Sequence, residues 1–278
     1  MQNIKAYIFL VLCTLFWAGN FIVGKVASLF EIPPFSLNFY RWLIAFIILF
    51  PFTYTKITEN FHEIKKKIIP LSIMGFTSIT IFNSVVYYSL NFTQVLNGVL
   101  MISTIPVLII FFSSCFTNEK IKINQILGVI TSLIGVLIII TKFQLNTLLS
   151  LNLNKGDLWI LVAMISWATY SIMVKEKKIN LDPLALLQTL IFIGLIFLIP
   201  FYLYELQNAQ FLKLNIPVLL TVGYVVIFAG IGAYIFWIGA IKIIGPSRSG
   251  VFLHLMPVFS SLMAIFLLGE RLANFHIF

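Results

Sequence analysis

Nine long apolar runs limit what this chain can fold into more than any other feature of its sequence. Each run holds roughly 20 mainly apolar residues, the length of a helix that crosses a bilayer. Apolar residue types make up 60% of the 278 residues and charged types only 10%, far from the composition of a soluble domain. The runs are roughly 4–28, 35–54, 68–90, 93–116, 123–141, 157–174, 183–204, 216–240 and 246–268. The predicted fold class is therefore an all-α polytopic membrane protein.

Basic residues are concentrated in alternate loops between these runs. With a cytoplasmic N-terminus, the loops on its side hold Lys5, Lys56, Lys65, Lys66, Lys67, Lys120, Lys122, Lys175, Lys177, Lys178, Lys242 and Arg248. The opposite loops hold only Lys142, Lys155, Lys213 and Arg271. Since Lys and Arg accumulate in cytoplasmic loops, the pattern predicts a cytoplasmic N-terminus in a bacterial inner membrane. The net charge of +9 is spread over short loops, so it does not indicate a nucleic-acid partner.

The second part of the chain repeats rare residues of the first at a constant distance. The pairs are Trp17-Ala18 with Trp167-Ala168, Pro51 with Pro200, Pro106 with Pro257, and Glu119-Lys120 with Glu270-Arg271, each 149 to 151 residues apart. Five helices per unit, an odd number, would make the second unit cross the membrane in the opposite direction. Inverted repeats of this kind are typical of transporters. The alternative is a coincidence between segments that are all rich in Leu, Ile and Phe. We expect two repeats, at residues 1–145 and 155–278.

Several stretches also resemble a known family. FWAGNFIVGK in the first run, FYRWLIAFIIL in the second and GPSRSGVFLHLMPVFSSLMAIFLLGERL in the ninth resemble the EamA family of the drug/metabolite transporter superfamily. The resemblance extends over essentially the whole chain. It implies a ten-helix fold of two inverted five-helix halves around a central cavity. It also implies carriage of amino acids, metabolites or drugs without ATP, and it does not specify the solute.

The end of the sequence departs from this ten-helix pattern. By the repeat distance, the partner of the run Ile123–Thr141 would occupy positions 274–292, whereas the sequence ends at Phe278. We therefore expect most of the tenth helix to be missing from this chain.

Polar and aromatic residues at helical spacing are the candidates for a solute cavity. On the first run Trp17 and Asn20 share a helix face, and spacings of three or four residues recur in the third and sixth runs. Trp and Tyr offer flat surfaces with one polar group, and Asn offers a donor and an acceptor, which suits an amino acid. The alternative is that the tryptophans belong to the interfacial aromatic belt or to helix packing. The candidates are Trp17, Asn20, Asn83, Tyr87, Trp167 and Tyr170.

Five further residues within or beside the runs have competing interpretations. His254 lies inside the ninth run, where a titratable group is costly, so it is a cavity or proton-responsive candidate. The alternative is a neutral His that bonds a carbonyl of a neighbouring helix. Pro106 and Pro257 should bend the fourth and ninth helices, either as gating hinges or as static kinks. Lys25 and Arg41 are expected near the outward boundary, with side chains that snorkel to water, and the alternative is that they bind solute directly.

The function predicted is secondary transport of small organic solutes by alternating access, with export of an amino acid or related metabolite. The chain has no Walker motif, HExxH motif or GxSxG elbow, and its three His residues lack metal-ligand spacing, so the sequence predicts no enzyme, no cofactor and no metal. The expected partners are a small-molecule substrate and the lipid bilayer, and coupling to a proton gradient is left open. Two alternatives remain: a structural or sensory membrane subunit that moves no solute, and a carrier of drugs or nucleotide-type metabolites.

Overall fold

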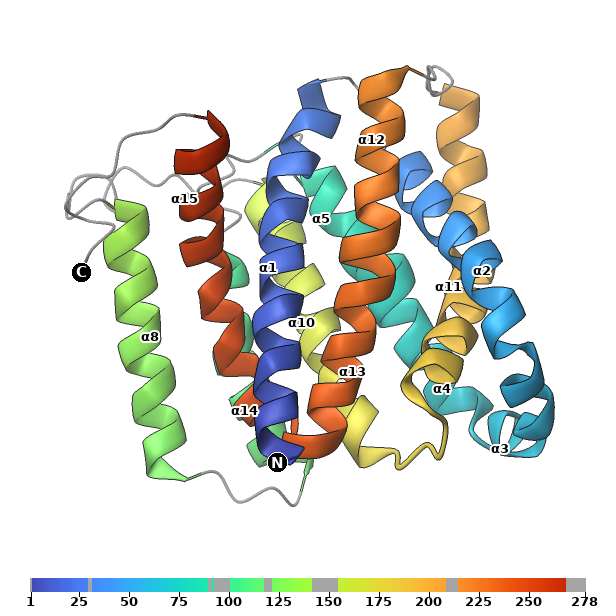
Figure 1. Ribbon diagram of the computed structural model, residues 1–278, viewed down its shortest axis with the longest axis horizontal. Coiled ribbons are helices and arrows are strands. Elements are labelled where there is room, and N and C mark those ends of the chain that lie inside the picture. Colours follow the sequence, from blue (N-terminus) through green and yellow to red (C-terminus); the bar gives the residue numbers. More distant parts are fainter. Residues whose placement is uncertain are drawn as a thin grey trace.

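The computed structural model describes most of the chain, and every element in the described part is a helix (Figure 1). This confirms the all-α class. Among the described residues, six helices are long and apolar enough to cross a membrane: Asn3–Asn20, Pro34–Glu59, Ile68–Ser89, Lys155–Glu176, Pro183–Gln207 and Ile216–Ile244. They coincide with six of the nine apolar runs. The described residues are 2–29, 32–89, 92, 101–117, 122–141, 155–208 and 215–268.

The order of the helices is similar in the two parts of the chain. The first part holds α1 (Gln2–Leu29), α2 (Pro34–Glu59), α3 (Phe61–Lys66), α4 (Ile68–Gly75), η1 (Phe76–Phe82), α5 (Asn83–Ser89), α7 (Ile105–Phe116) and α8 (Ile123–Thr141). The second holds α10 (Lys155–Glu176), α11 (Pro183–Asn208), α12 (Ile216–Tyr224), η2 (Val225–Gly232), α13 (Ala233–Ile244), α14 (Pro246–Val251), η3 (Phe252–His254) and α15 (Leu255–Leu268). The Glu119-Lys120 and Glu270-Arg271 pairs and the predicted start of a tenth helix lie outside the described residues.

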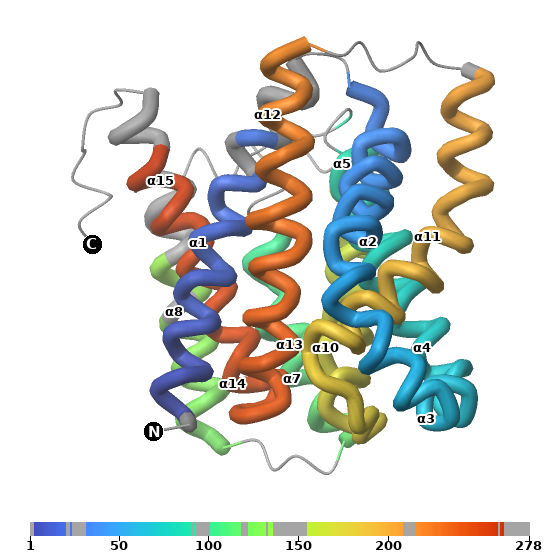
Figure 2. The backbone as a smooth tube through the Cα atoms, turned by 45° about the vertical axis from the view of Figure 1, so that its right-hand side comes forward, coloured from blue at the N-terminus to red at the C-terminus, as the bar shows by residue number. Residues whose placement is uncertain are grey.

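The helices of the two parts make corresponding contacts. Helix α1 contacts α13 and α15, and its equivalent α10 makes the corresponding contacts with α5 and α7. The equivalent helices α2 and α11 lie against each other, which Figures 1 and 2 both show. Helix α1 begins at the end of the molecule where α10 finishes, the lower end in Figure 1. Residues near the middle of α1 and α10 are thereby brought to the centre of the bundle.

Helix α2 begins against a carboxylate that α11 supplies. The Oε1 and Oε2 atoms of Glu205 accept hydrogen bonds from the backbone N–H groups of Phe35 and Ser36, at 3.1 and 2.6 Å. The first N–H groups of a helix have no partner within the helix, and this end of the helix dipole favours a negative charge. The hydroxyl groups of Tyr40 and Tyr202 lie 2.8 Å apart along the same interface. These contacts hold the two repeats together at this end of α2.

The basic loops that were predicted to share one side of the membrane lie together. Lys56 Nζ lies 2.7 Å from Asp182 Oδ2, and Lys67 Nζ donates to the Lys177 carbonyl at 3.3 Å. Lys175 Nζ, at the end of α10, donates to the carbonyl oxygen of Lys242 at 2.9 Å. These loops therefore form one end of the bundle, in agreement with the charge pattern.

The Lys56–Asp182 ion pair makes stability depend on pH. Partial burial by itself would raise the pKa of Asp182, but hydrogen bonds from Lys56 and from the Ala185 backbone N–H outweigh it and lower the pKa below its ordinary value. A lowered pKa in the folded state adds stability at higher pH, and this stability is lost as the pH falls through the folded pKa.

We expect Asp182→Asn to lower stability by under about 1 kcal/mol at neutral pH, since both partners are partly exposed. Thermal unfolding in detergent at several pH values measures this effect. The difference between the variant and the parent should vanish in acid. A difference that persists at low pH would show that the stability is lost with the hydrogen bond from the Ala185 N–H to Asp182 at the start of α11, and not with the ion pair.

Candidate functional site

Trp17 of α1 and Trp167 of α10 meet at the centre of the bundle. Their rings lie edge to face with centroids 5.0 Å apart, and only 7% and 1% of the two residues are exposed. Tyr234 and Trp237 of α13 complete the cluster, with centroids 5.3 to 5.9 Å from the two tryptophans. A belt tryptophan lies at the boundary between lipid and water. These two are instead enclosed by other helices, at the junction of the two repeats.

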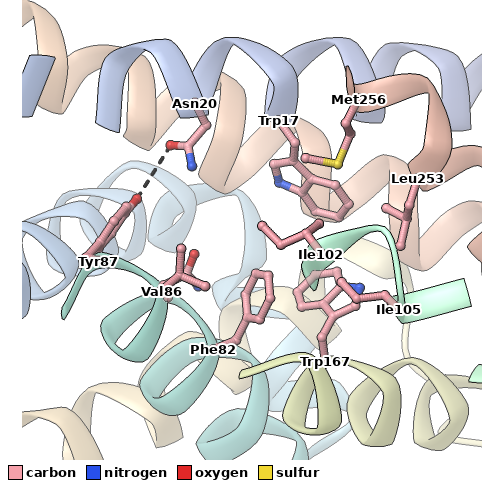
Figure 3. Close-up of a pocket in the computed structure, with 11 residues that line it drawn as sticks. Trp17, Asn20, Phe82, Val86, Tyr87, Ile102, Ile105, Trp167, Leu253 and Met256 are labelled. Atoms are coloured by element: carbon pink, nitrogen blue, oxygen red, sulfur yellow. Dashed lines mark hydrogen bonds between the residues drawn. The ribbon is translucent and has the colours of Figure 1, made fainter. Parts of the chain in front are cut away.

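A narrow cavity opens beside the two tryptophans. The space available to the centre of a water molecule is about 40 Å³, which is room for a few waters. Its walls come from both parts of the chain: α1, η1, α5, the helical residue Ile102, α7, α10, η3 and α15 (Figure 3). The lining residues are Trp17, Asn20, Phe82, Asn83, Val86, Tyr87, Ile102, Ile105, Trp167, Leu253 and Met256. Five of the predicted cavity residues are thus brought together around one space.

The guanidinium group of Arg41 is buried next to the polar wall of this cavity. Arg41 of α2 is 1% exposed, and its Nη1 donates to Asn83 Oδ1 at 2.9 Å and to the Tyr87 hydroxyl at 2.8 Å. The Tyr87 hydroxyl in turn points to Asn20 Oδ1 at 3.5 Å, as Figure 3 shows. The guanidinium carbon also lies 4.8 Å from the ring centroid of Trp42. The prediction that Arg41 snorkels to the outward boundary is therefore wrong, because α2 presents it to the interior of the bundle. The side chain of Lys25 lies outside the described part of the structure.

Two π-helices, one in each repeat, supply carbonyl groups to this network. The Ser78 carbonyl in η1 accepts hydrogen bonds from Asn83 Nδ2 at 3.0 Å and from the Tyr234 hydroxyl at 2.9 Å. The Ala229 carbonyl in η2 accepts from Trp17 Nε1 at 3.1 Å and from Arg41 Nη2 at 2.9 Å. Positions 78 and 229 are separated by the repeat distance of Pro106 and Pro257. Short π-helical stretches are frequent at functional sites.

Tyr170 and His254 lie near the cavity but do not line it. Tyr170 is fully buried against Trp167 and Tyr234, with ring centroids 5.1 and 6.2 Å away. His254 is 4% exposed, and its Nε2 lies 2.9 Å from the Ser103 carbonyl. The alternative interpretation of His254 expected a bond to a carbonyl of a neighbouring helix, and the carbonyl here belongs to the turn just before α7. Since positions 103 and 254 are also equivalent in the two repeats, the bond joins the repeats.

Pro106 and Pro257 stand in the first turn of a helical segment. Pro106 is the second residue of α7, and Pro257 is the third residue of α15, which follows the short 3₁₀ turn η3. A proline is tolerated there because the first N–H groups of a helix have no partner within the helix. The fourth and ninth runs are thus interrupted just before the prolines, in a pair of equivalent breaks beside the cavity.

Sequence reasoning placed Arg41 wrongly and missed Phe82 and the π-helices. The one signal for Arg41 was an ionisable residue inside an apolar run, which indicates function by default in a membrane protein. Phe82 precedes Asn83 by one residue, and nothing local distinguishes it from the other 27 phenylalanines. Among the described residues, no three His, Cys, Asp or Glu side chains come together as metal ligands. The polar groups of the site are instead amide, hydroxyl, indole and guanidinium groups, which bind through hydrogen bonds and charge.

Comparison with known proteins agrees with this architecture. An uncharacterized transporter of Archaeoglobus fulgidus is 27% identical over 270 residues, which cover 97% of this chain and 91% of the relative. The uncharacterized transporter YyaM of Bacillus subtilis is 24% identical over 277 residues, covering 100% and 90%. A solved structure titled "Crystal structure of protein" shares the fold, with a TM-score of 0.77 at 15% identity over 98% of this chain and 91% of the other. The EamA-like transporter family matches residues 4–141 and 154–278. The chain therefore belongs to the EamA-like transporter family.

Proposed function

We propose that this protein is a secondary transporter that moves small organic solutes across the cytoplasmic membrane by alternating access. The substrates proposed are amino acids or related metabolites, and the direction proposed is export. The observation that carries the proposal is the cavity at the junction of the two repeats, where Trp17 and Trp167 face each other. A solute held between two halves of opposite direction is exposed to one side or the other as the halves exchange shapes.

The cavity walls suit a solute with an apolar body and a polar head. Trp17, Phe82 and Trp167 form an aromatic surface, and Asn20 and Tyr87 carry polar groups on another part of the wall (Figure 3). Ligand sites bind through a few placed polar groups in a mainly apolar surround, and this cavity, with room for a few waters, would have to widen as the halves exchange shapes to admit such a solute. The aromatic part would hold the body of the solute, and the polar part would orient its head.

The breaks in the helices are the proposed moving parts. The equivalent breaks before Pro106 and Pro257 and the π-helix η1 contribute residues to the cavity wall, and its equivalent η2 bonds Trp17 of that wall through the Ala229 carbonyl. A change of backbone angle at such positions would alter one wall while the rest of the bundle keeps its packing. In this proposal residues 1–145 and 155–278 are the two halves that exchange shapes.

We propose that the N-terminus and the basic end of the bundle face the cytoplasm. Single cysteines at Lys66 and Lys177, in a background where Cys115 and Cys13 are Ser, should react with a membrane-impermeant thiol reagent only from the cytoplasmic side. A cysteine at the exposed Ile216, which begins α12 after the opposite loop, is the control and should react only from outside. Reaction of Lys66→Cys from outside in intact cells would overturn the proposed orientation.

The transport test uses the purified chain in liposomes. Initial uptake of a labelled panel of amino acids, nucleosides and small carboxylic acids is measured with and without a pH gradient, against protein-free liposomes. Saturable uptake of any of these solutes supports the proposal, and its response to the gradient shows whether protons are coupled. If folded protein moves none of them, the alternative of a structural or sensory membrane subunit is favoured.

A further inference from the structure

The positive charge of Arg41 beside the cavity is not balanced by a nearby negative charge among the described residues. In the described part of the chain, Arg41 has no carboxylate within ion-pair distance, and the groups that accept its hydrogen bonds are an amide, a phenol and a backbone carbonyl. Neutral acceptors solvate a guanidinium group without cancelling its charge. A buried charge in a membrane protein is costly unless it is paired, so such residues mark functional sites. The cavity therefore lies against an uncompensated positive charge.

Hydrogen-bond donors near the cavity also lack acceptors. Trp167 lines the cavity and is 1% exposed, and its Nε1–H has no partner among the described residues. The Nε–H of Arg41 is likewise unpartnered within the described structure. An unsatisfied buried donor costs free energy, and this cost is recovered when a ligand brings an acceptor. Among the described residues that line the cavity, the one unpartnered buried side-chain group is therefore a donor, the Trp167 N–H, which a ligand acceptor atom would satisfy.

Only one layer of side chains separates the charge of Arg41 from the cavity. Asn83 and Tyr87 line the space and both bond directly to Arg41, so a ligand that touches them lies one residue away from the guanidinium group. Water and salt screen charges only weakly in the interior of a membrane protein. The attraction between the guanidinium group and an anionic ligand therefore remains strong over this distance. Binding at this position is therefore stronger for an anionic group and weaker for an ammonium group.

We propose that the cavity selects small organic anions and takes their carboxylate group against the Tyr87 hydroxyl, in front of Arg41. The apolar body of the solute then lies against Trp17, Phe82 and Trp167. This inference rests on the proposed transport function and specifies its substrate class. A zwitterionic amino acid binds more weakly than its N-acylated form, because its ammonium group meets no carboxylate among the described residues of the cavity.

The test varies the charge of the solute on one amino-acid side chain. N-acetylphenylalanine, phenylalanine, N-acetylphenylalaninamide and phenylalaninamide share one body and are anionic, zwitterionic, neutral and cationic. The same four forms of alanine and leucine cover smaller bodies. Binding to the purified protein in detergent is measured by the quenching of tryptophan fluorescence and by the shift in melting temperature. Competition against a transported solute in liposomes gives a second readout.

The expected result is that the anionic form binds at least about tenfold more tightly than the neutral amide and that the cationic form binds weakest. Arg41→Gln should abolish this preference and Arg41→Lys should retain part of it. Arg248→Gln removes the same charge at the basic end of the bundle and is the matched control, with the preference unchanged. Trp167→Phe keeps an aromatic ring but removes the free N–H, and it should weaken binding of the anionic form severalfold more than binding of the neutral form.

Each other outcome counts against the proposal. Equal or tighter binding of the amide or the amine by the parent protein overturns it, and this measurement does not depend on whether Arg41→Gln folds. Failure of every compound to bind overturns it too. The proposed transport function is judged separately by the wider uptake panel, so uptake of neutral or cationic solutes alone would reject the anion selectivity and retain transport.

Discussion

Replacement of Gly194 by alanine is expected to lower the melting temperature in detergent by several degrees and to reduce the yield of folded protein. A Cβ atom at Gly194 in α11 would lie 2.4 Å from Ile79 Cβ in η1 and 3.1 Å from the Gly75 carbonyl oxygen. The first distance is shorter than real Cβ contacts, and neither neighbour is the end of a flexible side chain. Overpacking of this kind costs about 1–3 kcal/mol, and α11 would have to move away from η1.

Gly223→Ala is the matched control for this prediction. Gly223 lies in α12, and a Cβ atom there has no other atom within 4 Å. Alanine favours a helix by about 1 kcal/mol over glycine, so this variant should be as stable as the parent or slightly more stable. Equal melting temperatures for the two variants would show that α11 and η1 are not packed as closely as the structure indicates.

Replacement of Trp17 or Trp167 is expected to reduce transport more than any other single substitution, except a substitution of Arg41 itself. Trp17→Ala and Trp167→Ala should each lower the initial uptake rate per folded protein at least about tenfold, because each removes a wall of the cavity and an aromatic contact between the repeats. Both rings are buried, so a stability loss of about 3–5 kcal/mol accompanies the change. Uptake is therefore divided by the amount of monodisperse protein in the same preparation.

Trp159→Ala is the control on the same helix as Trp167. Trp159 is 46% exposed near the start of α10 and does not line the cavity. Its loss should leave the normalised uptake rate unchanged. If Trp17→Ala and Trp167→Ala lower folded protein and uptake in equal proportion, both tryptophans have only a packing role.

The helical class was predictable from the sequence because it rests on a local feature. A bilayer leaves no water for backbone groups, so a run of about 20 apolar residues must form a helix. Trp and Pro are rare enough that their constant spacing indicated a repeat, and the structure places Trp17 against Trp167. Helical spacing also placed Asn83 and Tyr87 on one face, and both line the cavity.

The surroundings of each helix were decided only by the tertiary structure. The charge of Arg41 was visible in the sequence, but its burial depends on groups 42, 46 and 188 residues away along the chain. The carboxylate at the start of α2 comes from Glu205, about 170 residues downstream. The same holds for η1 and η2, whose carbonyl groups bond side chains of other helices. Periodicity shows which residues share a helix face, whereas the partner of that face depends on how all the helices pack, and this decides whether a cation meets water or the interior of the protein.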